Sequence, residues 1–165
     1  MRTRIIACAI CGLIAIAAVA LMIVEGRTPS SPNTSQPIEV RYSDNLGSLP
    51  PAYARERTIV LAKDVLGAIS GSYTMKDGYQ KVLASAPIAL TEKEFGALVD
   101  AAKEVSPKET EALCVGGGGK DFFLTIGSTT REAYSVKCGE GTANQSLESF
   151  YADFIAPLIE KASSK

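Results

Sequence analysis

The pattern of apolar and polar residues divides the chain into three parts, and the first part is an uninterrupted apolar run of twenty residues from Ile5 to Val24. A helix of about that length crosses the roughly 30 Å hydrocarbon core of a bilayer. Arg2 and Arg4 precede the run, and basic residues in this position keep the amino terminus on the cytoplasmic side. Residues 1–24 are therefore predicted to form a transmembrane or signal helix.

Two outcomes remain open for this segment. A cleaved signal peptide has an apolar core of roughly 7–15 residues followed by small residues. Ala18-Val19-Ala20 supplies small residues, but the apolar run continues to Val24, which favours a retained anchor. A retained anchor gives a single-pass inner-membrane protein with its C-terminal domain in the periplasm. Cleavage near Ala20 gives a secreted or periplasmic protein instead.

The second part, residues 25–57, is rich in Pro, Ser, Asn and Thr and poor in apolar side chains. Such a segment buries too little apolar surface to offset the entropy of ordering its chain. We therefore expect a flexible tether with little regular structure, which touches the following domain around Ile38–Tyr42.

The third part, residues 58–165, contains two patterns of helical period. Thr91 and Glu94 have the spacing of a capping box, and Ser106-Pro107 provides a stop. A second helix is expected to begin near Ser146, and Pro157 should kink it or end it early. Behind each start, apolar residues recur on one helical face, namely Phe95, Leu98, Val99, Ala102 and Val105 in the first and Leu147, Phe150, Tyr151, Phe154, Leu158 and Ile159 in the second. Both stripes are predicted to face a hydrophobic core.

Strand signals surround these helices. Residues 58–70 fit either a strand or a helical face, and the β-branched Thr58-Ile59-Val60 together with Gly67 favours a strand. Asp77-Gly78 lies between two short runs and favours a tight hairpin turn through positive φ angles. Three further strand-like runs are Glu111–Val115, Phe122–Ile126 and Glu132–Lys137. This order predicts an α+β domain, a small antiparallel sheet with two helices packed on one face.

The composition excludes several classes of function. The chain has no histidine, so it lacks the commonest general base and the commonest imidazole ligand of metals. Acidic residues slightly outnumber basic ones beyond residue 57, which leaves no basic surface for nucleic acid. We therefore expect no enzyme activity, no metal, no cofactor and no nucleic-acid partner.

The run of four glycines at 116–119 followed by Lys120 resembles a phosphate-binding loop only superficially. Asp121 stands where such a loop has Ser or Thr, and a strand follows in place of a helix. The two flanking cysteines, Cys114 and Cys138, would lie in an oxidising compartment. Glycines let the chain double back so that the cysteines approach each other. We predict a structural disulfide between them, and no nucleotide.

Other polar groups offer weaker candidates. Arg131 lies in a polar turn that starts at Gly127, and four tyrosines could line a binding face, namely Tyr73, Tyr79, Tyr134 and Tyr151. Asn33 and Asn144 begin formal glycosylation sequons. Carboxylates are spread along the first helix and near the strands, at Glu92, Glu94, Asp100, Glu104, Glu109, Glu111 and Asp121. Nothing in the spacing of these carboxylates brings them together.

The functional hypothesis from the sequence is a membrane-tethered, extracytoplasmic domain that binds another envelope protein. The anchor, the tether, the disulfide and the missing catalytic set all favour it. A small secreted inhibitor or binding protein, released by cleavage near Ala20, is the first alternative. A carboxylate-based enzyme is the second alternative, and it requires two acidic groups that converge in a cleft.

Overall fold

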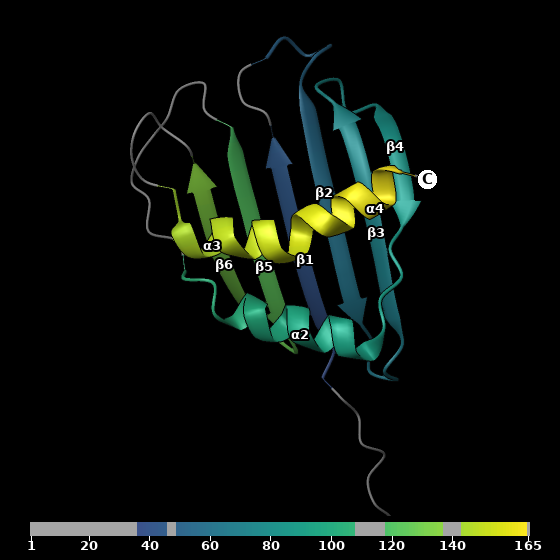
Figure 1. Ribbon diagram of the computed structural model, residues 1–165, viewed down its shortest axis with the longest axis vertical. Coiled ribbons are helices and arrows are strands. Elements are labelled where there is room, and N and C mark those ends of the chain that lie inside the picture. The colour runs from purple at the N-terminus through teal and green to yellow at the C-terminus, as the bar shows by residue number, and fades with distance from the viewer. Residues whose placement is uncertain (1–35, 46–48, 108–117, 137–142, 165) are drawn as a thin grey trace, which may run out of the picture. The chain divides into compact units, whose positions relative to one another are not determined.

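Six antiparallel strands form a single sheet, and the helices of the described part of the chain lie across one of its faces (Figure 1). The computed structural model describes residues 36–45, 49–107, 118–136 and 143–164. The strands are β1 (Ile38–Asn45), β2 (Arg55–Lys63), β3 (Ile69–Asp77), β4 (Val82–Pro87), β5 (Gly119–Ile126) and β6 (Thr129–Val136). The helices are α2 (Glu92–Lys103), α3 (Gln145–Phe150), the π-helical segment η1 (Tyr151–Ile155) and α4 (Ala156–Ser163). The α+β class and the antiparallel sheet are therefore confirmed.

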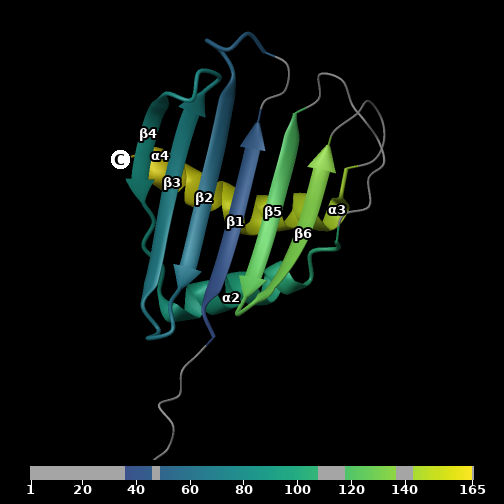
Figure 2. The ribbon, with the colours of Figure 1, turned by 180° about the vertical axis from the view of Figure 1, so that it is seen from behind.

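The strand order in the sheet is β4-β3-β2-β1-β5-β6. Seen from behind, the same sheet shows the face that the helices leave uncovered (Figure 2). Along each strand alternate residues point to the helices, so Tyr42 of β1 shares the covered face with its register partners Ile59 and Phe122. These residues and the apolar stripes of the helices make one core, as the helical periodicity predicts.

The folded unit begins earlier than residue 58. β1 belongs to the segment predicted to be a flexible tether, yet it pairs with β2 on one side and with β5 on the other. Its alternation explains this position, because Ile38, Val40 and Tyr42 point to the core between polar neighbours. The fourth position of this inward series is Asp44, a charged residue, and this shortens the apolar signal in the sequence.

The strand interpretation of residues 58–70 is confirmed at both ends of this range, because β2 continues to Lys63 and β3 begins at Ile69. The residues between them form the turn that joins the two strands. Between them Gly67 has φ +88, a conformation that favours glycine. The Asp77-Gly78 hairpin is also confirmed, but the positive φ of that turn is at Gln80. The Asp77 carboxylate accepts hydrogen bonds from the Tyr79 and Lys81 amides and so holds a longer turn than predicted.

The capping box of α2 is present, with Thr91 and Glu94 bonded in both directions. The second helical region runs from Gln145 to Ser163 and is not ended by Pro157. Proline lacks an amide hydrogen and its ring displaces the carbonyl four residues earlier. The segment η1 precedes Pro157 in the π form, in which the Ala156 amide donates to the Tyr151 carbonyl, five residues back. The wider turn lets the helix continue past the proline.

Several predictions fall outside the described residues. These are the anchor or signal segment of residues 1–24, the run Glu111–Val115, and both Cys114 and Cys138. Within the described ranges, no helix is long and apolar enough to span a membrane.

Candidate functional site

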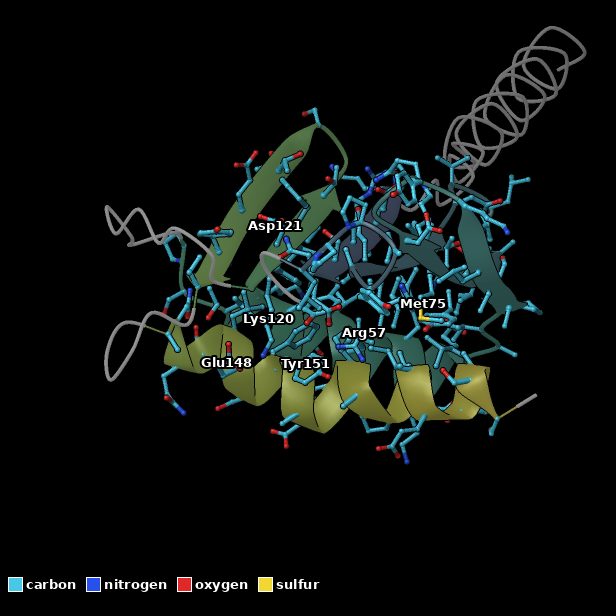
Figure 3. All side chains as sticks on the ribbon, turned by 90° about the horizontal axis from the view of Figure 1, so that it is seen from above. Arg57, Met75, Lys120, Asp121, Glu148 and Tyr151 are labelled. Atoms are coloured by element: carbon cyan, nitrogen blue, oxygen red, sulfur yellow. The ribbon has the colours of Figure 1, made fainter. Side chains whose placement is uncertain are left out.

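A row of charged and polar side chains crosses the covered face of the sheet near α3. Asp44 of β1 has Arg57 of β2 and Lys120 of β5 as its register partners, and Lys120 in turn pairs with Ser135 of β6. Glu148 of α3 approaches the same row from the helix layer. Figure 3 shows Arg57, Lys120, Glu148 and Tyr151 gathered between the sheet and the helix, while Asp121 lies apart from them. We call Asp44, Arg57, Lys120, Ser135 and Glu148 the polar row.

Asp44 is the most buried charge of the polar row, with 5% of its surface exposed. It accepts two hydrogen bonds from the Arg57 guanidinium, at 2.8 and 2.7 Å, and one from the Tyr42 hydroxyl at 3.0 Å. Such two-pronged arginine–carboxylate bonds are strong and fix orientation. Burial, with the charge of Asp44 and the hydrogen bond to it, raises the pKa of Tyr42, so this hydroxyl stays a donor. Desolvation lowers the pKa of Arg57, but hydrogen bonding and charge from Asp44 outweigh it and the net pKa is raised.

The other half of the polar row joins α3 to β5 and β6. Glu148 forms an ion pair with the Lys120 ammonium and accepts a hydrogen bond from the Ser135 hydroxyl at 2.8 Å. The Lys120 ammonium also lies 4.1 Å from the centre of the Tyr151 ring, a cation–π distance. Tyr151 stacks on Tyr42 with ring centres 5.5 Å apart. The two halves of the row are thus connected through a pair of tyrosines.

The arrangement of the polar row suits holding the helix on the sheet better than catalysis. Two acidic and two basic groups balance, and their donors and acceptors are directed at one another. Ser135, the one hydroxyl of the polar row, is only 2% exposed, so a substrate could not reach it as a nucleophile. Among the described residues no group of three or more Cys, Asp or Glu side chains could hold a metal ion.

Arg131 and Asn144, two of the weaker candidates from the sequence, are engaged in hydrogen bonds that support the fold. Arg131 donates hydrogen bonds to the carbonyls of Lys103 and Val105, where the last turn of α2 leaves carbonyls without helical partners. Asn144 caps α3 by accepting from the Leu147 amide, and its amide nitrogen donates to the Ser106 carbonyl. That nitrogen is already in contact with the Ser106 backbone, so the sequon is not expected to be modified. Asn33 lies outside the described residues.

The carboxylates of α2 do not converge. Glu92 pairs with Lys63 and Asp100 pairs with Lys103, while Glu94 serves the capping box. Glu104 is exposed at the end of α2, and Asp121 of β5 is partly buried. Glu109 and Glu111 lie outside the described residues. The four tyrosines do not share one face, because Tyr73 is in the core, Tyr151 belongs to the helix layer, Tyr79 is on a turn and Tyr134 is on β6.

An exposed apolar cluster stands out at one end of the sheet, and sequence patterns did not reveal it. Of the seven large apolar side chains exposed in the described part of the chain, five lie on two adjoining turns and the start of β4. They are Leu49, Tyr53, Tyr79, Val82 and Leu83. We call this set the tyrosine end. Tyr53 and Tyr79 are its most prominent members, 68% and 70% exposed.

The two turns of the tyrosine end are held together by the backbone. The Gly78 amide donates to the Pro51 carbonyl at 2.9 Å, and a Cβ on Gly78 would lie 2.6 Å from the Pro51 Cα. The turns lie side by side at one end of the sheet in both ribbon views (Figures 1 and 2). The glycine at position 78 therefore permits the two turns to approach closely. Tyr53 and Tyr79, which are far apart in sequence, consequently lie at the same end of the domain. A local pattern cannot show this.

The remaining sheet surfaces are less suited to binding. The uncovered face carries mainly Ser, Thr and charged side chains, as at Arg41, Ser43, Ser72 and Thr74. Directly after the edge strand β4, the Ile88 amide donates to the Gly71 carbonyl of β3. The preceding nitrogen, that of Pro87, therefore faces away from β3, and it has no hydrogen to donate. Proline on the outer side of an edge strand opposes the addition of another strand.

Comparison with known proteins assigns no family to this chain. No protein-family model matches it, and neither a curated protein nor a solved structure matches it.

Proposed function

We propose that this chain is a membrane-tethered, extracytoplasmic domain that binds another envelope protein through the tyrosine end. The observation that carries the proposal is the concentration of exposed apolar side chains there, headed by Tyr53 and Tyr79. Tyrosine is enriched among the residues that contribute most to protein–protein binding. Clustered exposed apolar groups mark interaction sites more often than scattered ones do.

The form of the surface supports a partner protein over a small molecule. The pocket beside the two turns holds about 170 Å³, and five of its seven lining residues are charged or polar, among them Arg55, Glu56 and Asp77. Pockets for small ligands typically hold about 300–1,000 Å³ and are mostly apolar. Tyr53 and Tyr79 project from turns, which is how rigid scaffolds present binding residues. Because Pro87 opposes strand addition, the partner contacts side chains rather than the β4 backbone.

A non-catalytic role agrees with the polar row, whose charged groups are engaged with one another. The proposed anchor at Ile5–Val24 would hold the domain at the periplasmic side of the inner membrane. In that compartment Cys114 and Cys138 would form the proposed disulfide. A binding protein released by cleavage near Ala20 would use the same tyrosine end, and the amino-terminal sequence of the mature chain distinguishes the two forms.

Comparative isolation of the full-length chain from its own membranes tests the proposal. Three forms are compared by quantitative mass spectrometry: the natural chain, a Tyr53→Ser, Tyr79→Ser variant, and a Val65→Ser, Leu66→Ser control. The control also removes two exposed apolar side chains, but from the β2–β3 turn. We expect at least one envelope protein to be recovered with the natural and control chains and lost with the tyrosine variant. Equal recovery from all three forms would overturn the proposal.

A further inference from the structure

A groove separates the carboxyl-terminal end of α2 from α3 and η1, on the helix layer and away from the tyrosine end. Its volume is about 300 Å³, at the lower limit for a ligand pocket, so it fits one or two side chains rather than a whole small molecule. Its apolar lining is Ala101, Val105, Phe150 and Phe154, and its polar lining is Glu104, Ser146, Ser149 and Asp153. α2 and the second helical region lie on the same face of the sheet, one below the other (Figure 1).

The apolar wall of this groove is held firmly in place. Phe154 stacks on Phe150 with ring centres 5.6 Å apart, and Phe150 meets Phe122 of β5 edge-on at 5.2 Å. Phe150 and Val105 are buried, whereas Phe154 is only partly buried. The row of aromatic rings therefore extends from the core to the surface, where the last ring lines the groove. A partly exposed aromatic ring with rigid support is a preformed contact for an apolar side chain.

The rim of the groove carries negative charge. Glu104 and Asp153 are both exposed and line it, and no lysine or arginine is among the lining residues. Among the described residues, Lys103 in the last turn of α2 pairs with Asp100, and Arg131 of β6 binds the carbonyls at the end of α2. Neither rim carboxylate forms an ion pair with another residue in the described part of the chain.

We propose that this groove docks a basic amphipathic segment of a partner protein. An apolar side chain of that segment enters between Phe154 and Val105, and a flanking Lys or Arg contacts Glu104 and Asp153. Amphipathic helices bind apolar grooves in this way, through side chains spaced by three or four residues. The charges on the rim select a cationic segment and reject an acidic one. This docking site is independent of the tyrosine end, so the domain has two separate contact surfaces.

Binding of synthetic peptides to the full-length chain in a non-ionic detergent tests the groove. Three helical peptides of equal length are used: one of Leu and Lys, one of Leu and Glu with the same spacing, and one with Ser in place of Leu. We expect saturable binding of the Leu/Lys peptide only, with a clear loss of affinity as the salt concentration rises. Equal binding of the Leu/Glu peptide would show that the groove takes apolar groups regardless of charge, and would overturn the proposal.

Variants locate the binding on the chain. The pair Glu104→Gln and Asp153→Asn is expected to weaken the Leu/Lys peptide about tenfold, or about 1.4 kcal/mol. Glu132→Gln with Glu160→Gln makes the same change in net charge on exposed residues outside the groove, and should leave the affinity unchanged. Ser149→Arg puts a cation in the exposed lining without disturbing the core, and should abolish binding. If the two charge pairs weaken binding equally, the groove is not the docking site.

Discussion

Asp44 and Arg57 face each other across β1 and β2, and the guanidinium donates to both oxygens of the carboxylate, at 2.8 and 2.7 Å. This pair lies under the helix layer at an end of the covered face where an apolar core residue would otherwise stand. Because Asp44 is nearly buried, its charge depends on Arg57 and on the Tyr42 hydroxyl for compensation.

The first prediction concerns this pair. Asp44→Asn leaves the Arg57 charge without its partner, so we expect the free energy of unfolding to fall by about 3 kcal/mol in denaturant titrations. Adding Arg57→Met removes the orphaned charge, and the double variant should lose less than the sum of the two single variants. Glu39→Gln disrupts the exposed pair with Arg41 and should cost less than about 1 kcal/mol. Strict additivity of the Asp44 and Arg57 changes would contradict the role of the pair.

The second prediction contrasts two glycines. Gly78→Ala places a Cβ against the Pro51 backbone, so we expect it to destabilise the domain by about 1–3 kcal/mol and to separate the turns of the tyrosine end. Gly96→Ala lies in α2 with nothing within 4 Å of the new Cβ. It should stabilise the domain by about 0.5–1 kcal/mol, because alanine favours the helix. Thermal unfolding measures both changes, and a Gly78→Ala variant as stable as the natural chain would count against the close approach of the turns.

The third prediction concerns acid. Hydrogen bonds from the Thr91 side chain and then the Thr91 backbone lower the pKa of Glu94 below 4.5, its ordinary value. A carboxylate whose pKa is lowered by folding stabilises the folded state fully above 4.5, its pKa in the unfolded chain. This stabilisation is lost as the pH falls through the lower pKa of the folded state. Glu94→Gln should therefore reduce the loss of stability below pH 4.5, whereas Glu160→Gln should not. Identical acid profiles for the natural chain and Glu94→Gln would show that the capping box contributes nothing.

The helices were predictable because their signals are local. The Thr91–Glu94 box and the stripe from Phe95 to Val105 occupy one continuous stretch, and a period of 3.6 residues repeats within it. Pro157 was the difficulty, since a proline signals a break, and only the π-helical geometry of η1 shows how the chain avoids one. The β2 and β3 strands were predictable from β-branched residues and a turn, with ends a few residues away from those expected.

The central strand and both proposed surfaces were not predictable in this way. β1 lies in a stretch of the sequence rich in Pro and Ser. Its last inward position is Asp44, and burying this charge is energetically acceptable only because Arg57 lies opposite it. The tyrosine end depends on the contact of Gly78 with Pro51, and the groove depends on α2 lying beside η1. Each brings together segments that are distant in sequence, and a single sequence carries no record of such pairing.

The fourth prediction concerns Cys114 and Cys138. If the domain lies outside the cytosol, alkylation of the denatured, non-reduced chain should leave both cysteines unmodified, and peptide mapping by mass spectrometry checks this. Replacing both with Ser should lower the free energy of unfolding by roughly 3–4 kcal/mol, because the disulfide closes a loop in the unfolded chain. Alkylation of both residues without prior reduction would show that they form no disulfide. It would also take away the main reason to place the domain in an oxidising compartment.

The proposed contact through the tyrosine end is tested most directly by photo-crosslinking in intact cells. A photoreactive phenylalanine analogue replaces Tyr79 in the full-length chain, and the same analogue replaces Leu66, which is also exposed but lies on the β2–β3 turn. We predict a discrete adduct with one envelope protein from position 79 and none from position 66. No adduct from position 79, or the same adduct in equal yield from both positions, would contradict the account.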